Sequence, residues 1–214
     1  MIRYSGPIFL HPPKTAGSSI INALVQSKIA VVDDPFDVKT FPGFDLATHH
    51  TFKEFGYSAN ADYAISVRLP YTRYVSLFYE AVWPHEKKDS DDAIIKFKRY
   101  MLKQLYGGGV RTFPCTYWTN SITGKINIIK FENLIEDVNS IYHIDLRSFK
   151  RFARHGLGTN YTGTVTEQET IKSILKFYDD ATIGIINKIA QSDFTTFGYT
   201  KFNNYQEMID YAQT

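Results

Sequence analysis

The sequence has little that would tie it to the cell exterior, to nucleic acid or to a membrane. Its single cysteine, Cys115, excludes an internal disulfide, so no oxidising compartment is required. The 24 Lys and Arg residues nearly balance the 22 Asp and Glu residues, which removes the electrostatic case for binding nucleic acid. No apolar run approaches the ~20 residues of a membrane span, and the first apolar segment begins too close to Met1 for a secretory leader. We therefore expect a cytoplasmic chain with no membrane span and no nucleic-acid partner.

Internal repeats and long linkers are also absent from the 214 residues. With 43% hydrophobic residues, the chain can bury a substantial core. Because α/β folds often exceed the usual domain length, the chain need not be divided. The sequence predicts one domain over residues 1–214.

What the sequence does contain is an apolar strand followed by a loop of the anion-binding type. Residues 8–10 (IFL) form a short apolar run that Pro12 and Pro13 terminate, because proline has a fixed φ and no amide donor. Residues 14–19 (KTAGSS) supply a lysine, hydroxyls and a glycine where residues 20–24 begin a helical spacing. A helix N-terminus presents unpaired N–H groups and partial positive charge. The segment therefore predicts a site for a phosphate or a similar anion.

The order of residues in this loop separates it from the common nucleotide-binding motifs. The Walker pattern G-x-x-x-x-G-K-[ST] has its lysine after the second glycine, whereas Lys14 precedes Gly17. The dinucleotide fingerprint G-x-G-x-x-G is absent as well. The residues alone also allow a plainer interpretation, in which Lys14 is a solvated loop lysine and Ser18 is a helix cap.

Residues 11–19 (HPPKTAGSS) resemble the "H-x-P-K-[TC]-[AG]-G-[TS]-S" loop of the carbohydrate-type sulfotransferases. In that family the loop holds the 5′-phosphosulfate of 3′-phosphoadenosine 5′-phosphosulfate (PAPS). The resemblance implies that the cofactor contacts Lys14, Thr15, Ala16, Gly17, Ser18 and Ser19. It also implies a catalytic role for Lys14, whose charge would stabilise the bridging and equatorial oxygens during transfer.

A second strand–turn–helix pattern occupies residues 63–79. Residues 63–67 (YAISV) are apolar, Arg68 follows, and Pro70 stands near the start of a helix, where proline is tolerated. An arginine at a strand end offers a bidentate fork for a phosphate. The segment resembles the family's "V-R-[ND]-P-[YFW]-x-R-x-[VL]-S-x-[YF]" motif, whose Arg and Ser bind the 3′-phosphate of the cofactor. The resemblance assigns that role to Arg68 and Ser76.

Three residues of this second segment have alternative interpretations. Leu69 stands where the family usually has a polar residue, and we interpret the change as a turn variation because the position is not a phosphate ligand. Without the motif, Ser76 is equally well explained as a helix-face serine bonded to its own backbone. For Arg73 we favour a structural ion pair.

Residues 48–55 contain two adjacent histidines, His49 and His50. Sulfuryl transfer to a hydroxyl needs a base, and histidine titrates in the useful range. The stretch resembles the family's "K-H-x-T-x-x-E-[LIF]" or "H-x-x-[FY]" segment, whose histidine is the candidate base. His49 matches both forms and is our catalytic candidate, with His50 as the fallback. We predict no metal site, because no cluster of Cys, Asp or Glu at ligand spacing accompanies the pair.

Two later segments also resemble the family. Residues 113–138 match "P-x-x-x-W … G-x-[IV] … [RK]-[FY]-E-N-L-x-x-D", and residues 193–199 match the closing "D-[FY]-x-x-F-G-Y". For Glu132 and Asp137 we favour helix-start electrostatics and capping over catalysis. Cys115 is expected to have a packing role and not a nucleophilic one.

The spacing of apolar residues predicts the order of the elements. Strands are expected at residues 8–10, 29–32 and 126–129, and residues 61–83 are expected to form a strand followed by a helix. A further helix should follow the first strand and end near residue 27. Other helices are expected at residues 91–105, 132–139 and 167–190. Strands that alternate with helices imply an α/β protein with a parallel sheet covered on both faces. The resemblance runs in order from residue 6 to residue 199 and implies a P-loop-like three-layer sandwich with a central parallel sheet.

Together these patterns predict a sulfotransferase that moves a sulfuryl group from PAPS to a hydroxyl of an acceptor, with a carbohydrate favoured over another small molecule. The chain resembles the soluble bacterial or viral members of the family. Such transfer depends mainly on positioning and electrostatics, so no metal is demanded. Two alternatives stay open, namely a P-loop-like ATP-dependent kinase and a non-catalytic module that binds a nucleotide or a glycan.

Overall fold

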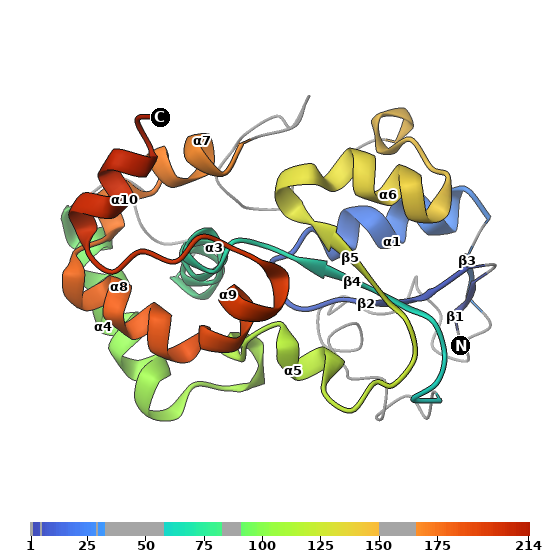
Figure 1. Cartoon of the computed structure of the whole chain (residues 1–214), viewed down its shortest axis with the longest axis horizontal. Helices are drawn as coiled ribbons and strands as arrows, with labels where there is room; N and C mark the ends of the chain where they lie inside the picture. The colour runs from blue at the N-terminus through green and yellow to red at the C-terminus, as the bar shows by residue number, and fades with distance from the viewer. Residues whose placement is uncertain (1, 5, 29, 33–57, 83–90, 150–165) are drawn as a thin grey trace. The chain divides into compact units, whose positions relative to one another are not determined.

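The computed structural model describes residues 2–4, 6–28, 30–32, 58–82, 91–149 and 166–214 (Figure 1). Contacts along the chain divide it into two compact units. Unit 1 comprises residues 1–67 and 117–152, and unit 2 comprises residues 68–116 and 153–214. A single domain over residues 1–214 stays a prediction.

A three-stranded parallel sheet forms the centre of unit 1. Its strands are β2 (Ile8–Leu10), β4 (Tyr63–Val67) and β5 (Ile126–Lys130), in the order β2-β4-β5. All five residues of β4 are buried, as in the central strand of a parallel sheet that is covered on both faces. The mixed α/β class predicted from the sequence is therefore confirmed.

Two helices, α1 (Gly17–Gln26) and α6 (Leu134–Tyr142), lie along one face of this sheet, as Figure 1 shows in blue and yellow. Their apolar sides share one core with the strands, formed by Phe9, Ile20, Ile21, Ala23, Leu24, Ala64, Ile129, Leu134, Ile135, Val138, Tyr142, Ile144 and Leu146. Burial of these side chains fixes α1 against β2 and β4. The start of α1 is thereby held where β2 ends.

The first strand of the chain was not predicted. β1 (Ile2–Tyr4) pairs antiparallel with β3 (Ala30–Val32) in a separate two-stranded sheet, whereas the sequence pattern implied parallel strands only. A strand of three residues is too short to show a reliable alternation. The other short elements of unit 1 are α5 (Thr116–Thr119), which begins at the unit boundary, and the 3₁₀ helices η2 (Phe131–Asn133) and η3 (Leu146–Ser148).

The described part of unit 2 is helical. Its elements are α3 (Pro70–Val82), α4 (Asp91–Gly107), η1 (Val110–Thr112), α7 (Glu167–Lys172), η4 (Leu175–Phe177), α8 (Asp180–Ile189), α9 (Gln191–Phe197) and α10 (Tyr205–Tyr211). α3 packs against α4, α7 and α8. Phe78, Phe97 and Phe177 form an aromatic centre with ring centroids 5.4–6.5 Å apart. Such contacts between aromatic rings stabilise a core beyond simple burial.

The prediction of one helix over residues 167–190 is wrong, because the chain breaks into α7, η4 and α8. The carboxylate of Asp179 accepts a hydrogen bond of 2.9 Å from the amide of Thr182 and so caps α8. Phe177 and Tyr178, just before this cap, are buried. The break contains no glycine or proline, so the apolar spacing alone masked it.

Asp137 lies in the first turn of α6, as the favoured helix-start role requires, but the hydrogen bonds recorded for it are not those of a helix cap. Its carboxylate accepts hydrogen bonds from the backbone amide of Lys130 and from the side chain of Asn133, each at 2.7 Å. Asp137 therefore joins the end of β5 to the first turn of α6, where a negative charge is favourable. Among the described helices, none has the length and apolar character needed to cross a membrane.

Candidate anion-binding site

The loop between β2 and α1 turns through two left-handed residues. Lys14 has φ 66° and Ala16 has φ 69°, a region that non-glycine residues rarely adopt. Such conformations cost about 1–3 kcal/mol each and persist only where the surroundings enforce them. Lys14 is half-buried, and Ala16 is the N-cap of α1. The loop thus reverses the chain sharply and ends in a helix N-terminus.

The N-terminus of α1 has no side-chain cap within the described residues, and its first turn holds no acidic residue. The amide of Ser19 donates to the carbonyl of Ala16 at 3.0 Å, but no hydrogen bond from the amides of Gly17 or Ser18 is recorded within the part of the chain that the structure describes. The side chain of Ser18 is exposed. The interpretation of Ser18 as a helix cap is therefore wrong, because it lies inside α1. Donors and partial positive charge remain at this helix end.

Thr15 points into the protein. Its side chain is fully buried, and its hydroxyl donates to the carbonyl of Pro12 at 2.7 Å. The same oxygen lies 2.6 Å from the hydroxyl of Ser66 in β4. Because the single hydroxyl proton of Thr15 is used on Pro12, Ser66 must be the donor in this pair. The side chain of Thr15 thus connects the loop to β4. Any contact of Thr15 with a ligand would be made by its backbone.

Gly17 lies against the ring of His11. An ideal Cβ at Gly17 would stand 1.8 Å from Cδ2 and 2.3 Å from Nε2 of that ring, so no larger residue fits without rearrangement. His11 is itself buried, and its ring stacks on Phe9 with centroids 6.3 Å apart. Sequence reasoning recognised the glycine but missed both His11 and Ser66. A serine within an otherwise apolar strand was the available signal for Ser66.

In unit 2, Arg68 is oriented by a neighbouring threonine. Its Nε donates to Oγ1 of Thr72 at 3.0 Å, and the hydroxyl of Thr72 donates to the carbonyl of Leu69 at 2.9 Å. Ser76 follows one turn later on α3 and is also buried. Within the described residues, no hydrogen bond from the hydroxyl of Ser76 to its own backbone is recorded.

Arg73 has a structural role, but the ion pair favoured for it stays a prediction, because its recorded hydrogen bonds go to backbone carbonyls. The guanidinium is fully buried and donates to the carbonyl oxygens of Phe113 and Arg111 at 2.9 and 3.1 Å. Nearby, the carboxylate of Asp193 accepts from the amide of Cys115 at 2.7 Å. Burial raises the pKa of Asp193, and the positive charge of Arg73 opposes this shift. These groups hold the helices of unit 2 together.

The expected packing role of Cys115 agrees with its surroundings. The thiol is fully buried, and burial raises its pKa, as does the neighbouring carboxylate of Asp193. A thiol whose pKa is raised is a poor nucleophile near neutral pH, because the thiolate is the reactive form.

The predicted catalytic base lies outside the described residues. His49 and its fallback His50 both belong to the range 33–57. Of the other predicted residues, Lys14 to Ser19 lie in unit 1, and Arg68 and Ser76 lie in unit 2. Among described side chains, no group of three or more His, Cys, Asp or Glu residues is arranged to hold a metal ion.

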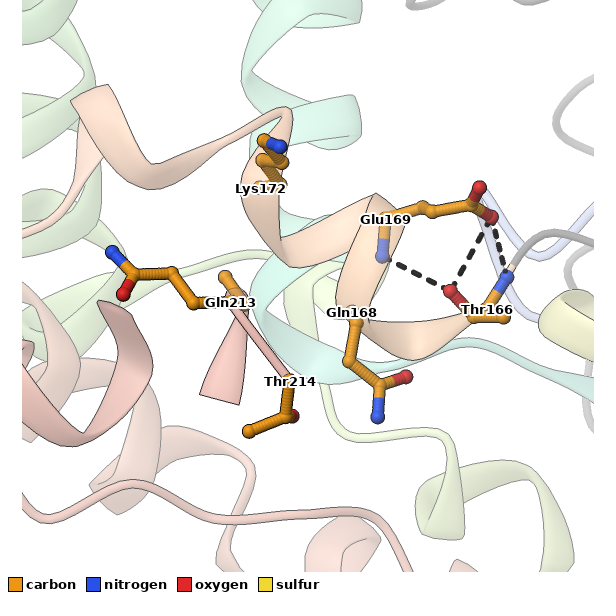
Figure 2. A pocket seen from close by; sticks show the side chains of 7 residues that line it. Thr166, Gln168, Glu169, Lys172, Gln213 and Thr214 are labelled. Atoms are coloured by element: carbon orange, nitrogen blue, oxygen red, sulfur yellow. Dashed lines mark hydrogen bonds between the residues drawn. The ribbon is translucent and has the colours of Figure 1, made fainter. Parts of the chain in front are cut away.

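A hollow of about 400 Å³ opens beside α7 and the end of α10 in unit 2 (Figure 2). It is lined by Thr166, Gln168, Glu169, Lys172, Ala212, Gln213 and Thr214, and none of the predicted site residues is among them. Figure 2 shows Thr166 and Glu169 bonded to each other in a capping box, with Glu169 Oε2 accepting from the amide of Thr166 at 3.0 Å. The acid in this hollow is therefore engaged in starting α7.

Comparison with known proteins adds no relative, because no family model, curated protein or solved structure matches this chain.

Proposed function

We propose that this chain is a PAPS-dependent sulfotransferase that transfers a sulfuryl group to a hydroxyl, with a carbohydrate as the favoured acceptor. One observation carries the proposal: the loop after parallel strand β2 passes through two left-handed residues into the uncapped N-terminus of α1. This is the backbone arrangement that binds phosphate and similar anions. In the proposal the sheet and its helices belong to a P-loop-like three-layer sandwich.

The proposal gives the 5′-phosphosulfate to the loop of unit 1. The amides of Gly17 and Ser18, the hydroxyls of Ser18 and Ser19, and the ammonium of Lys14 are its donors. A helix end contributes only about 0.3–1 kcal/mol to an exposed charge, and one hydrogen bond to a charged group about 1.5–3 kcal/mol. Micromolar affinity needs about 8 kcal/mol, so several of these donors must act together. A second phosphate contact is required for tight binding.

The 3′-phosphate of the cofactor we assign to Arg68 and Ser76, as the resemblance implies. Arg68 directly follows β4 in the chain, and Ser76 lies two turns into α3. A guanidinium binds phosphate through two parallel N–H donors, which gives orientation as well as affinity.

The proposed reaction is an in-line displacement. The imidazole of His49 accepts the proton of the acceptor hydroxyl while the acceptor oxygen bonds to sulfur. The bond between sulfur and the bridging phosphate oxygen breaks, and its electron pair stays on that oxygen. The products are a sulfate ester and adenosine 3′,5′-bisphosphate. Lys14 and the loop amides stabilise the charge that develops on the bridging and equatorial oxygens.

The decisive experiment measures transfer of labelled sulfate from PAPS to a panel of glycans and small alcohols, together with calorimetric binding of adenosine 3′,5′-bisphosphate. Lys14→Ala should abolish transfer and weaken binding. Lys28→Ala is the matched control, because Lys28 also has a left-handed φ, of 56°, and lies at the opposite end of α1. Its activity should equal that of the wild type.

His49→Ala should lower turnover by about two to four orders of magnitude, as expected for loss of a general base, without changing binding of the bisphosphate. His50→Ala tests the fallback, and unchanged turnover in His49→Ala would remove His49 from the mechanism. Arg68→Ala should weaken binding, whereas Arg147→Ala, which removes an exposed arginine paired with Asp145, should not.

Three results would overturn or narrow the proposal. A wild-type protein that does not bind adenosine 3′,5′-bisphosphate is not a PAPS enzyme. Binding without transfer to any acceptor of the panel would indicate a nucleotide-binding module. Magnesium-dependent turnover of ATP would indicate a kinase.

A further inference from the structure

Polar residues recur at intervals of four where β4 leads into α3. Arg68, Thr72 and Ser76 are all buried, with 9%, 1% and 5% of their surfaces exposed. Positions four apart on a helix share a face, so Thr72 and Ser76 lie one above the other on α3. Thr72 stands between the two residues to which we assign the 3′-phosphate, and its hydroxyl is already engaged with Arg68 and with the carbonyl of Leu69.

The hydrogen bonds of Thr72 have a defined direction. Its only proton goes to the carbonyl of Leu69, so its oxygen presents a lone pair to Nε of Arg68. The guanidinium is planar and rigid, and fixing the Nε–H direction therefore fixes the directions of both Nη groups. A bidentate contact with phosphate depends on that orientation.

We infer that Thr72 is a positioning residue that orients Arg68 toward the 3′-phosphate and so sets the preference for nucleotides that carry one. The inference rests on the proposed function. Pro70 and Leu69 support the arrangement, because the helix begins at Pro70 and the carbonyl of Leu69 accepts both from the amide of Arg73 and from Thr72. The hydrogen bonds that form the first turn of α3 therefore also orient Arg68.

The test compares two nucleotides on one set of variants. Calorimetry measures the Kd of adenosine 3′,5′-bisphosphate and of adenosine 5′-monophosphate for the wild type, Thr72→Val, Thr72→Ala and Thr72→Ser. Thr72→Val keeps the shape of the side chain and removes the oxygen. We expect it to weaken binding of the bisphosphate about ten- to hundredfold, which is the effect of losing one hydrogen bond to a charged group. The Kd of the monophosphate should be nearly unchanged. Thr72→Ser keeps the oxygen and should restore the wild-type preference.

Two controls separate orientation from folding. Thr170→Val removes another buried threonine hydroxyl of unit 2, whose hydrogen bonds within the described residues go to the backbone carbonyls of Thr166 and Glu167, and it should leave both Kd values unchanged. Adding Thr72→Val to Arg68→Ala should cause no further loss, because Thr72 acts through Arg68. Thermal unfolding identifies any variant that fails to fold, and Thr72→Ala then takes the place of Thr72→Val.

The outcomes distinguish this inference from the function on which it rests. A wild-type protein that does not bind the bisphosphate overturns the proposed function and the inference with it. A wild type that binds, together with a Thr72→Val variant that binds equally well, overturns the inference alone. Equal weakening of both nucleotides would assign Thr72 a purely structural role and would also overturn it.

Discussion

The hydroxyl oxygens of Thr15 and Ser66 lie 2.6 Å apart and are both buried. Ser66 donates a hydrogen bond to Thr15, and the hydroxyl of Thr15 donates to the carbonyl of Pro12. The pair joins the loop that precedes α1 to the central strand of the sheet. The left-handed conformations of Lys14 and Ala16 are therefore held from two directions, by the helix and by the strand.

The first prediction concerns this pair. Ser66→Ala removes one donor and should lower the free energy of unfolding by about 1 kcal/mol, the net value of a typical hydrogen bond. Thr15→Val should cost more, about 1–3 kcal/mol per group, because both the carbonyl of Pro12 and the hydroxyl of Ser66 lose their recorded partner in a buried place.

Urea denaturation of the two variants and of the double variant measures the difference. Because the residues are in contact, the double variant should be less destabilised than the sum of the two. Strict additivity would contradict the contact between the two hydroxyls. A larger loss in Ser66→Ala than in Thr15→Val would contradict the proposed direction of the hydrogen bonds.

The sequence predicted the elements around this pair but not the pair itself. The apolar run of β2, the helical spacing of α1 and the apolar run of β4 are local patterns, and each appears where it was predicted. The contact between Thr15 and Ser66 joins positions that are 51 residues apart. Periodicity relates a residue to its near neighbours, so it carries no information on such a contact.

The loop shows the same limit in another form. Its glycine, hydroxyls and lysine predict an anion-binding site, but the sequence does not show which side chains face a ligand. In the structure Thr15, in the loop, faces inward, whereas Ser18, in the first turn of α1, faces outward, although both are short hydroxyl residues. Lys14 and Ala16, on either side of Thr15, have left-handed backbone conformations that set the path of the chain here. Lysine and alanine rarely adopt this conformation, so the sequence does not predict it.

Gly17→Ala should destabilise the protein and weaken binding of adenosine 3′,5′-bisphosphate. Helix propensity alone would favour alanine by up to ~1 kcal/mol. The added Cβ would stand 1.8 Å from the buried ring of His11, and overpacking of this kind costs about 1–3 kcal/mol. The steric cost should therefore exceed the gain in propensity.

His11→Ala in the same chain supplies the control, because it removes the atoms that the new Cβ would meet. In that background Gly17→Ala should be neutral or slightly stabilising. Thermal unfolding of the single and double variants measures the coupling, and a Gly17→Ala variant that is as stable as the wild type would contradict the close approach.

The thiol of Cys115 should be unreactive in the folded protein. It is fully buried, and burial raises its pKa above the ~8.5 of a free cysteine, so little thiolate forms at pH 8. Reaction with a chromogenic disulfide reagent should be about a hundredfold slower than in urea, and its rate should follow the opening of unit 2. Complete labelling of the folded protein on mixing would contradict this. Because Cys115 is the single cysteine, the signal needs no assignment.

The cap of α8 should make stability depend on pH in the acid range. Asp179 accepts from the amide of Thr182 at 2.9 Å and pairs with Lys98 at 2.6 Å. Burial raises the pKa of Asp179, but the hydrogen bonds from Lys98 and Thr182 outweigh it, and the pKa is lowered overall. A carboxyl whose pKa is lowered by folding stabilises the protein above its unfolded pKa of ~3.9, and this contribution is lost as the pH falls through the folded pKa.

Asp179→Ala should therefore lower the free energy of unfolding by about 1 kcal/mol at pH 7, the usual effect of losing an N-cap. The pair with Lys98 adds little, because its side chains are 39% and 43% exposed. Asp179→Asn keeps a capping oxygen and removes the charge, so it should lose less at pH 7. Urea midpoints measured at pH 7 and at pH 3 test the sign, since the gap between wild type and Asp179→Ala should narrow in acid. A gap that stays constant would show that the ionised carboxylate contributes nothing through this cap.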